Sequence, residues 1–162
     1  MAFIDLDSDN PVEHASFYNV FEAVGLGCSN YTEDVKVVQF FLKRVYLTED
    51  FKTSKPFGEM LTDGLCGPTT RRWITKFQFD MQKRGRKCLG DGIVNRAGNA
   101  QSNWEASISH TNYTIRHLNN MLRKHDTAVY KTLTINQEVP ADLRLIFLQI
   151  HAEGPPMNFG SS

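Results

Sequence analysis

The sequence is poor in cysteine, has no excess of either charge and contains no long apolar run. Its three cysteines, Cys28, Cys66 and Cys88, cannot all pair within one chain, and their spacing fits no compact metal site. We therefore expect three small apolar side chains and no metal, with a Cys28–Cys88 disulfide left open. Lys plus Arg equals Asp plus Glu at 18 each, so the chain lacks the overall positive field that gathers nucleic acid. The basic run at 83–87 is interpreted as a solvated helix end.

Targeting and membrane signals are missing as well. Acidic residues occupy 1–14, where a secretory signal carries basic residues, and no apolar segment follows them. No run reaches the roughly 18 apolar residues that a membrane-spanning helix needs. The sequence therefore predicts no contact with a membrane. It leaves the localisation unknown, because a chain trimmed of its signal would have the same pattern.

Familiar catalytic motifs are absent too. The chain has no G-x-S-x-G, no H-E-x-x-H and no phosphate-binding Gly-rich loop, and its five histidines are scattered. One of them, His125, falls near the end of a predicted helix, where the helix dipole favours the charged imidazole. We expect a protein that is not an enzyme and uses no cofactor.

Apolar residues recur at spacings of three and four in several segments, which is the period of an α-helix. These segments are 12–24, 35–46, 68–83, 112–125 and 140–150. The second of them is apolar almost all round, as a central helix is. Polar stretches at 47–62 and 95–110 are expected to be long loops. The pattern predicts an all-α fold with no sheet of more than two short strands.

Two of these helices have faces of clear character. The outer face of the 68–83 helix is expected to carry Arg72, Lys76 and Lys83. The last helix has the broadest apolar stripe, formed by Leu143, Ile146, Phe147 and Ile150 and widened by Leu145 and Leu148. We expect this stripe to dock the last helix on the rest of the chain.

A tight double turn precedes the third helical segment in the stretch DGLCGPTTRRWITKFQ, residues 63–78. Glycine reaches backbone angles that are closed to other residues, so Gly64 and Gly67 are expected to shape this turn. Asp63 is expected to accept hydrogen bonds from its own turn, and Pro68 suits the first turn of a helix. A shorter echo, DGIV, returns at Asp91 and predicts a second reversal of the chain.

The order of these features resembles the type 1 peptidoglycan-binding domain across residues 31–125. The residues that match its first helix are Val35, Val38, Gln39 and Leu42. The residues that match its first turn and second helix are Asp63, Gly64, Gly67, Pro68, Thr70, Ile74, Phe77 and Gln78. Its second turn is matched by Asp91, Gly92, Ile93 and Val94. The resemblance implies a core of three helices packed orthogonally, in which most of these residues are scaffold.

The resemblance also sets the expected domains: a helical extension at 1–30, the binding domain at 31–126, a C-terminal helix packed on it at 127–154, and a flexible tail at 155–162. The chain departs from the pattern at several positions. Cys66 stands where an aromatic residue is usual and is expected in the core, and Trp73 replaces a small residue. After the second turn the usual G-P-x-T is missing, and the third helix follows only after a long insertion.

The function that the resemblance implies is non-catalytic binding of bacterial peptidoglycan, by its stem peptide or its glycan, in a groove between helices. The predicted contacts are Arg72, Trp73, Arg96 and Asp63, with a place in the core as the competing interpretation of Trp73. The residues outside 31–125 are too few for a catalytic domain. Wall binding would place the protein in the periplasm or outside the cell, reached by a non-standard route or by a chain that has lost its signal.

The alternative function uses the same fold to bind a protein. A phage component, or a cargo or adaptor of a specialised secretion machine, would meet the wall without a standard export signal. Such a module would contact its partner through the long loops or through the 140–150 helix.

Overall fold

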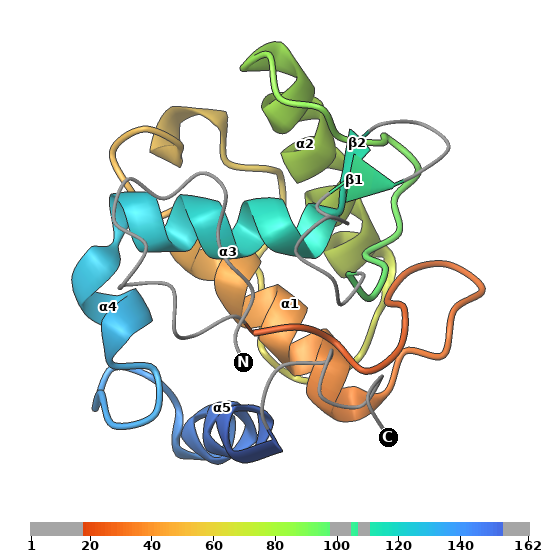
Figure 1. Ribbon diagram of the computed structural model, residues 1–162. Coiled ribbons are helices and arrows are strands. Elements are labelled where there is room, and N and C mark those ends of the chain that lie inside the picture. Colours follow the sequence, from red (N-terminus) through yellow and green to blue (C-terminus); the bar gives the residue numbers. More distant parts are fainter. Residues whose placement is uncertain (1–17, 98–104, 107–110, 154–162) are drawn as a thin grey trace.

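The structure is a computed structural model that describes residues 18–97, 105–106 and 111–153, most of which are helical (Figure 1). The helices in these ranges are α1 (Thr32–Val45), α2 (Pro68–Lys83), α3 (Thr114–His125), α4 (Thr127–Lys131) and α5 (Ala141–Glu153), with a short 3-10 turn, η2 (Lys52–Ser54). Two strands of two residues each, β1 (Glu105–Ala106) and β2 (Thr111–Asn112), pair antiparallel. The predicted all-α fold is therefore confirmed for the described residues.

Helices α1 and α3 form the centre of the molecule. Figure 1 shows α3 lying across α1, and α2 and α5 both pack on α1. The segment 114–122 of α3 is buried throughout, and α1 buries residues on nearly every side. The prediction of a central helix at 35–46 is confirmed, and α3 shares that place with it.

The last helix, α5, is docked on the core as the sequence predicts. The ring of Phe147 stacks on that of Phe41 from α1, with centroids 5.7 Å apart and planes 14° apart. Leu143 is fully buried beside it. Leu145 and Leu148 instead lie on the exposed side of α5, so the prediction that they widen the buried stripe is wrong.

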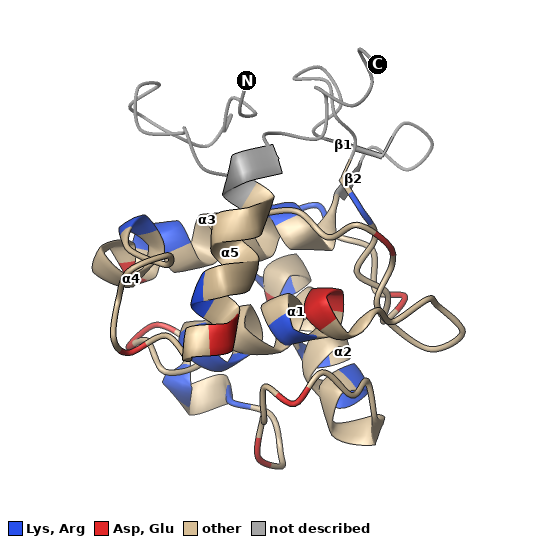
Figure 2. Cartoon of the chain, turned by 90° about the horizontal axis from the view of Figure 1, so that it is seen from below, with Lys and Arg blue, Asp and Glu red and all other residues tan. Residues whose placement is uncertain are grey.

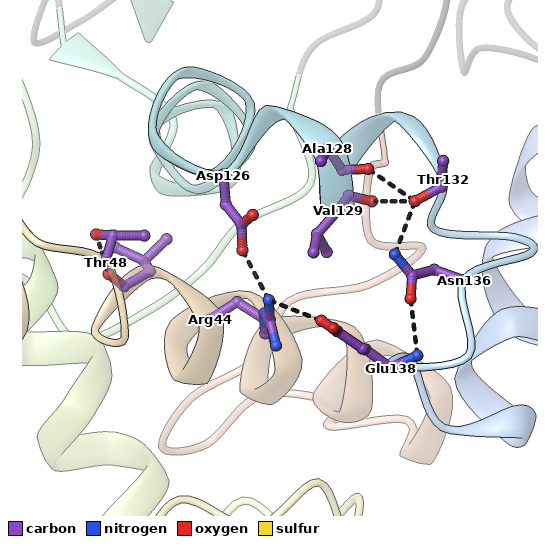
Figure 3. Close-up of polar contacts among 9 residues, drawn as sticks. Arg44, Thr48, Asp126, Ala128, Val129, Thr132, Asn136 and Glu138 are labelled. Atoms are coloured by element: carbon purple, nitrogen blue, oxygen red, sulfur yellow. Dashed lines mark hydrogen bonds and ion pairs between the residues drawn. The ribbon is translucent and has the colours of Figure 1, made fainter.

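An arginine of α1 fixes the chain that leads from α3 to α5 (Figure 3). The guanidinium of Arg44 lies 2.8 Å from the carboxylate of Asp126, a residue between α3 and α4. It also lies 3.5 Å from the carboxylate of Glu138, which precedes α5. Asn136 donates to the Thr132 hydroxyl at 2.9 Å and accepts from the backbone amide of Glu138 at 2.7 Å. These contacts set where α5 begins.

The predicted helix at 12–24 is wrong for residues 18–24, which have no helix, and the rest of it lies outside the described residues, as does the predicted tail at 155–162. Side chains from other parts of the chain accept hydrogen bonds from the backbone amides of this segment. Asn119 accepts from residue 18, and the carboxylate of Asp34 accepts from residues 21 and 22. Val24 then pairs with Val94 in an isolated β-bridge. Tertiary contacts override the local helical period here.

Candidate ligand-binding groove

The buried side chain of Gln39 holds the first Asp-Gly turn against α1. Its Nε2 donates to the Asp63 carboxylate at 3.0 Å and to the Thr70 hydroxyl at 2.9 Å. The same nitrogen lies 3.0 Å from the Leu65 carbonyl oxygen, and Oε1 accepts from the Gly64 amide at 2.9 Å. This set, the first glutamine network, fixes both the turn and the start of α2 relative to α1.

Gln78 on α2 repeats this arrangement at the second Asp-Gly turn. Its Nε2 donates to the Asp91 carboxylate at 3.2 Å, to the Thr114 hydroxyl at 2.9 Å and to the Ile93 carbonyl oxygen at 3.1 Å. Its Oε1 accepts from the Gly92 amide at 2.7 Å. In this second glutamine network every partner has the role of its counterpart in the first. The echo in the sequence is thus a structural repeat that links α1 to α2 and then α2 to α3.

Thr114 is the member of the repeat that sequence reasoning missed. In the first network the threonine follows the aspartate by seven residues, and in the second by 23, because the 95–110 insertion lies between them. Thr114 has the position relative to Gln78 that Thr70 has relative to Gln39. A threonine in the first turn of the helix that follows each Asp-Gly turn is the signal that would have found it.

The need for glycine lies at Gly64 and Gly92 rather than at Gly67. Gly64 has φ +81°, and a Cβ added there would lie 2.6 Å from the Thr32 Cγ2 atom. Gly92 has φ +73°. Gly67, the N-cap of α2, has φ −93°, and an added Cβ would meet nothing within 4 Å. The prediction that Gly67 adopts an angle closed to other residues is wrong, because one left-handed residue per turn completes the reversal.

Asp63 acts as an anchor of its own turn, as predicted. It accepts from the Leu65 amide at 3.0 Å as well as from Gln39. Both hydrogen bonds stabilise the carboxylate and hold the pKa of Asp63 below its usual value, although the side chain is largely exposed. A carboxylate with a lowered pKa is ionised at neutral pH and can bind a cationic group.

The loop that precedes this turn leaves two hollows against α1 and α2. One, of about 400 Å³, is lined by Lys43, Tyr46, Leu47, Lys55, Gly58, Glu59, Met60 and Trp73. The other, of about 270 Å³, is lined by Gln39, Glu59, Met60, Leu61, Asp63, Leu65, Gly67, Pro68, Thr69 and Thr70. The two hollows meet at Glu59 and Met60. We refer to them together as the loop groove.

The loop groove has cations at one end and carboxylates in its middle and at its other end. Lys43 and Lys55 line the larger hollow, and within the described residues neither ammonium group makes an ion pair. Glu59 lies at the junction of the hollows and Asp63 in the smaller one. The groove therefore suits a ligand that carries both a carboxylate and an amine.

Trp73 contributes to a wall of this groove from within the core. The residue is 2% exposed, and its indole N–H donates to the backbone carbonyl of Phe57 at 3.2 Å. Its ring meets that of Tyr46 edge to face, with centroids 5.6 Å apart. The competing interpretation of Trp73, as a core residue, agrees with this burial, and the same side chain also lines the larger hollow.

The remaining predicted contacts lie elsewhere. Arg72 is exposed on the outer face of α2, with its guanidinium 5.8 Å from the centre of the Phe57 ring. Arg96 follows the second Asp-Gly turn, and its Nη1 lies 3.4 Å from the carbonyl oxygen of Phe21. The four predicted site residues therefore do not share one pocket: Asp63 and Trp73 line the loop groove, whereas Arg72 and Arg96 line neither of its hollows.

A buried aspartate that sequence reasoning did not single out binds Tyr46, which lines the larger hollow of the groove. Asp80, which is 5% exposed, accepts from the Tyr46 hydroxyl at 2.6 Å, from the Ser54 hydroxyl at 3.1 Å and from the Lys76 ammonium at 2.7 Å. Burial, followed by the hydrogen bond to Asp80, raises the pKa of Tyr46, which stays a neutral donor. The cluster joins α1, η2 and α2, and so positions the loop that forms the groove.

The three cysteines and His125 are the other titratable residues that the sequence singled out. All three cysteines are free thiols, so the disulfide that the sequence left open is not formed, and burial raises the pKa of Cys88 to about 11. Cys66 is half-buried and packs against the core. Burial lowers the pKa of His125, although Asp50 opposes it, so the net shift runs against the charged form that the helix dipole was expected to favour.

Among the described residues, no group of three or more His, Cys, Asp or Glu side chains could hold a metal ion. No helix within those ranges is both long enough and apolar enough to cross a bilayer.

Comparison with known proteins adds no relative to this picture. No family model, no curated protein and no solved structure matches the chain.

Proposed function

We propose that this chain is a non-catalytic module that binds bacterial peptidoglycan, and that the stem peptide occupies the loop groove. The observation that carries the proposal is the pair of glutamine networks. They join α1, α2 and α3 through two Asp-Gly turns, in the order that the type 1 peptidoglycan-binding domain pattern requires. On this proposal, α1, α2 and α3 are the orthogonal three-helix core of that domain.

The chemistry of the groove fits a stem peptide. Such a peptide presents free carboxylates, amide groups, short apolar side chains and, in many walls, a free amine. Lys43 and Lys55 would bind a carboxylate, and Glu59 and Asp63 would bind the amine. Met60 and the neighbouring loop supply apolar surface for methyl groups.

The way the candidate groups are used supports the proposal that the module is non-catalytic. Asp63 is bound by its own turn and by Gln39, and its pKa is lowered. Asp80 is buried under three hydrogen-bond donors, and the thiol of Cys88 has a raised pKa. Asp80 and Cys88 are buried, and the lowered pKa of Asp63 does not favour general acid or base catalysis at neutral pH.

Co-sedimentation with sacculi stripped of anionic polymers tests the proposal. Wild-type protein should bind saturably with an affinity near micromolar, about −8 kcal/mol, because a shallow groove buries few contacts. Lys43→Ala/Lys55→Ala should weaken binding about tenfold or more. Lys124→Ala/Lys131→Ala removes the same charge outside the groove and should bind like wild type. Equal binding by the two double variants, or no saturable binding by wild type, would overturn the assignment.

A second candidate function is protein binding through α5. Leu145 and Leu148 stand one helical turn apart on its outer side and are 67% and 50% exposed. Exposed leucines so placed favour contact with a partner, such as a phage component or a specialised-secretion adaptor. If this is the function, Leu145→Ser/Leu148→Ser should abolish a complex with that partner without changing the melting temperature, and sacculi should not bind.

A further inference from the structure

Positive charge is concentrated on α2 and the turn that follows it. Residues 68–87 contain seven Lys and Arg and a single acidic residue, Asp80, a net charge of +6. Because the whole chain is neutral, the remaining residues carry −6 together. Asp80 is buried and binds Lys76, so this stretch exposes no carboxylate. Figure 2 shows Lys and Arg, in blue, on α2.

The cations form a row along the outer face of the helix. Arg72, Lys76, Phe79 and Lys83 follow each other at spacings of four, three and four, which keeps them on one side of an α-helix. At about 1.5 Å per residue, the row is roughly 16 Å long. A shallow hollow of about 660 Å³ runs beside it and is lined by Pro68, Arg71, Arg72, Thr75, Lys76 and Phe79.

Two exposed phenylalanines hold these cations in place. The ring of Phe79 has the ammonium of Lys76 at 6.0 Å from its centre and that of Lys83 at 5.5 Å. The ring of Phe57 has the Arg72 guanidinium at 5.8 Å. Cation–π attraction restrains otherwise mobile side chains, so the charges are organised before a ligand arrives. Because at least one cation approaches each ring, less of the ring surface is left for stacking with nucleic-acid bases.

We infer that the outer face of α2 binds an anionic phosphodiester polymer of the cell wall, of the poly(glycerol phosphate) type. Such a polymer carries one negative charge per unit and no bases, so it matches a row of cations and needs no aromatic ring for stacking. Residues 68–87 expose no carboxylate that would repel the phosphates, so this face is complementary in charge to the polymer. This inference rests on the proposed wall-binding function and names a second ligand in the same layer.

The two ligand sites flank α2 and adjoin at Pro68, which lines both the smaller hollow of the loop groove and the hollow on the outer face. Trp73 and Thr70 line the loop groove, whereas the adjacent Arg72 lies on the outer face. A wall in which phosphodiester polymers are attached to peptidoglycan would present both ligands at once. Binding at the second site then becomes intramolecular, which strengthens attachment without any new contact.

Isothermal titration with isolated poly(glycerol phosphate), free of peptidoglycan, tests the inference. Wild-type protein should bind, and raising the salt from about 50 to 200 mM should weaken binding at least tenfold. Arg72→Gln/Lys83→Gln should lose about tenfold or more in affinity. Lys124→Gln/Lys131→Gln should bind like wild type. Lys76 is left unchanged, because removing it would leave the Asp80 carboxylate buried without its cation.

Each contrary result has a distinct meaning. Equal losses in the two double variants would show that net charge alone matters, which overturns the assignment to this face. Tighter binding of single-stranded DNA with the same number of phosphates would identify a nucleic-acid surface instead, and no binding of the polymer at low salt would refute the site. Sacculi stripped of the polymer report on the loop groove only, so failure there is separable from failure here.

Discussion

Replacing Gln39 by methionine tests whether the first glutamine network holds the fold together. Methionine nearly preserves the volume of the buried glutamine but removes its donor and its acceptor. The buried Gly64 amide then loses its acceptor, which costs about 1–3 kcal/mol. Thr70 keeps only the Leu65 carbonyl oxygen at 3.4 Å, and Asp63 keeps only the Leu65 amide. We expect a total loss of about 2–4 kcal/mol, because the lost hydrogen bond to buried Thr70 adds about 0.5–1.5 kcal/mol and the one to exposed Asp63 adds little.

Differential scanning calorimetry measures this loss directly. For a domain of this size, each kcal/mol lowers the melting temperature by about 2–4 °C, so Gln39→Met should melt roughly 5–15 °C below wild type. Gln137 is exposed and serves as the control, because Gln137→Met should cost under about 0.5 kcal/mol. A Gln39→Met protein that melts within about 2 °C of the control would refute the reasoning, since the turn would then be held by other contacts.

Three further predictions concern the turn, α5 and pH. Gly64→Ala should lower the free energy of unfolding by about 1–3 kcal/mol, because its φ is +81° and the new Cβ would meet Thr32. Gly67→Ala should lower it by under about 1 kcal/mol. Comparable losses for the two variants in urea titrations would contradict the assignment of the need for glycine to Gly64. Phe147→Ala should cost about 3–5 kcal/mol, because the ring is fully buried against Phe41, and a near-native denaturation midpoint would mean that α5 is not docked in solution. Because the pKa of His125 is lowered in the folded state, the imidazole binds a proton more readily in the unfolded chain. The stability that the neutral imidazole contributes is therefore complete above about pH 6.5 and is lost as the pH falls towards the pKa of the folded state. His125→Gln should flatten the stability curve between about pH 7 and 5, and an unchanged slope would show that another group titrates there.

The helices could be predicted from the sequence because their signal is local. The apolar period at 35–46, 68–83, 112–125 and 140–150 marks α1, α2, α3 and α5. Pro68 gives the start of α2 for the same local reason. Where burial depends on distant segments, the pattern misleads: residues 18–24 have a helical period but are bound by Asn119 and Asp34 instead.

The glutamine networks could be predicted only in part. Asp63 and Asp91 were recognisable because an Asp-Gly pair has a local turn chemistry. The roles of Gln39 and Gln78 as hydrogen-bond centres, and the part that Thr114 takes, depend on contacts across 13 to 36 residues. The loop groove was beyond prediction, because its walls come from α1, α2 and an irregular loop that Asp80 positions from below.

The measurement that tests the central claim most directly is an NMR titration of ¹⁵N-labelled protein with a soluble muropeptide that carries a free stem peptide. If the loop groove binds the stem peptide, the backbone amides of Lys43, Lys55 and residues 57–65 and the indole N–H of Trp73 should shift in a saturable way. The amides of α5 should stay unchanged. Shifts confined to other faces of the molecule, or no shifts at millimolar muropeptide, would contradict peptidoglycan binding in this groove.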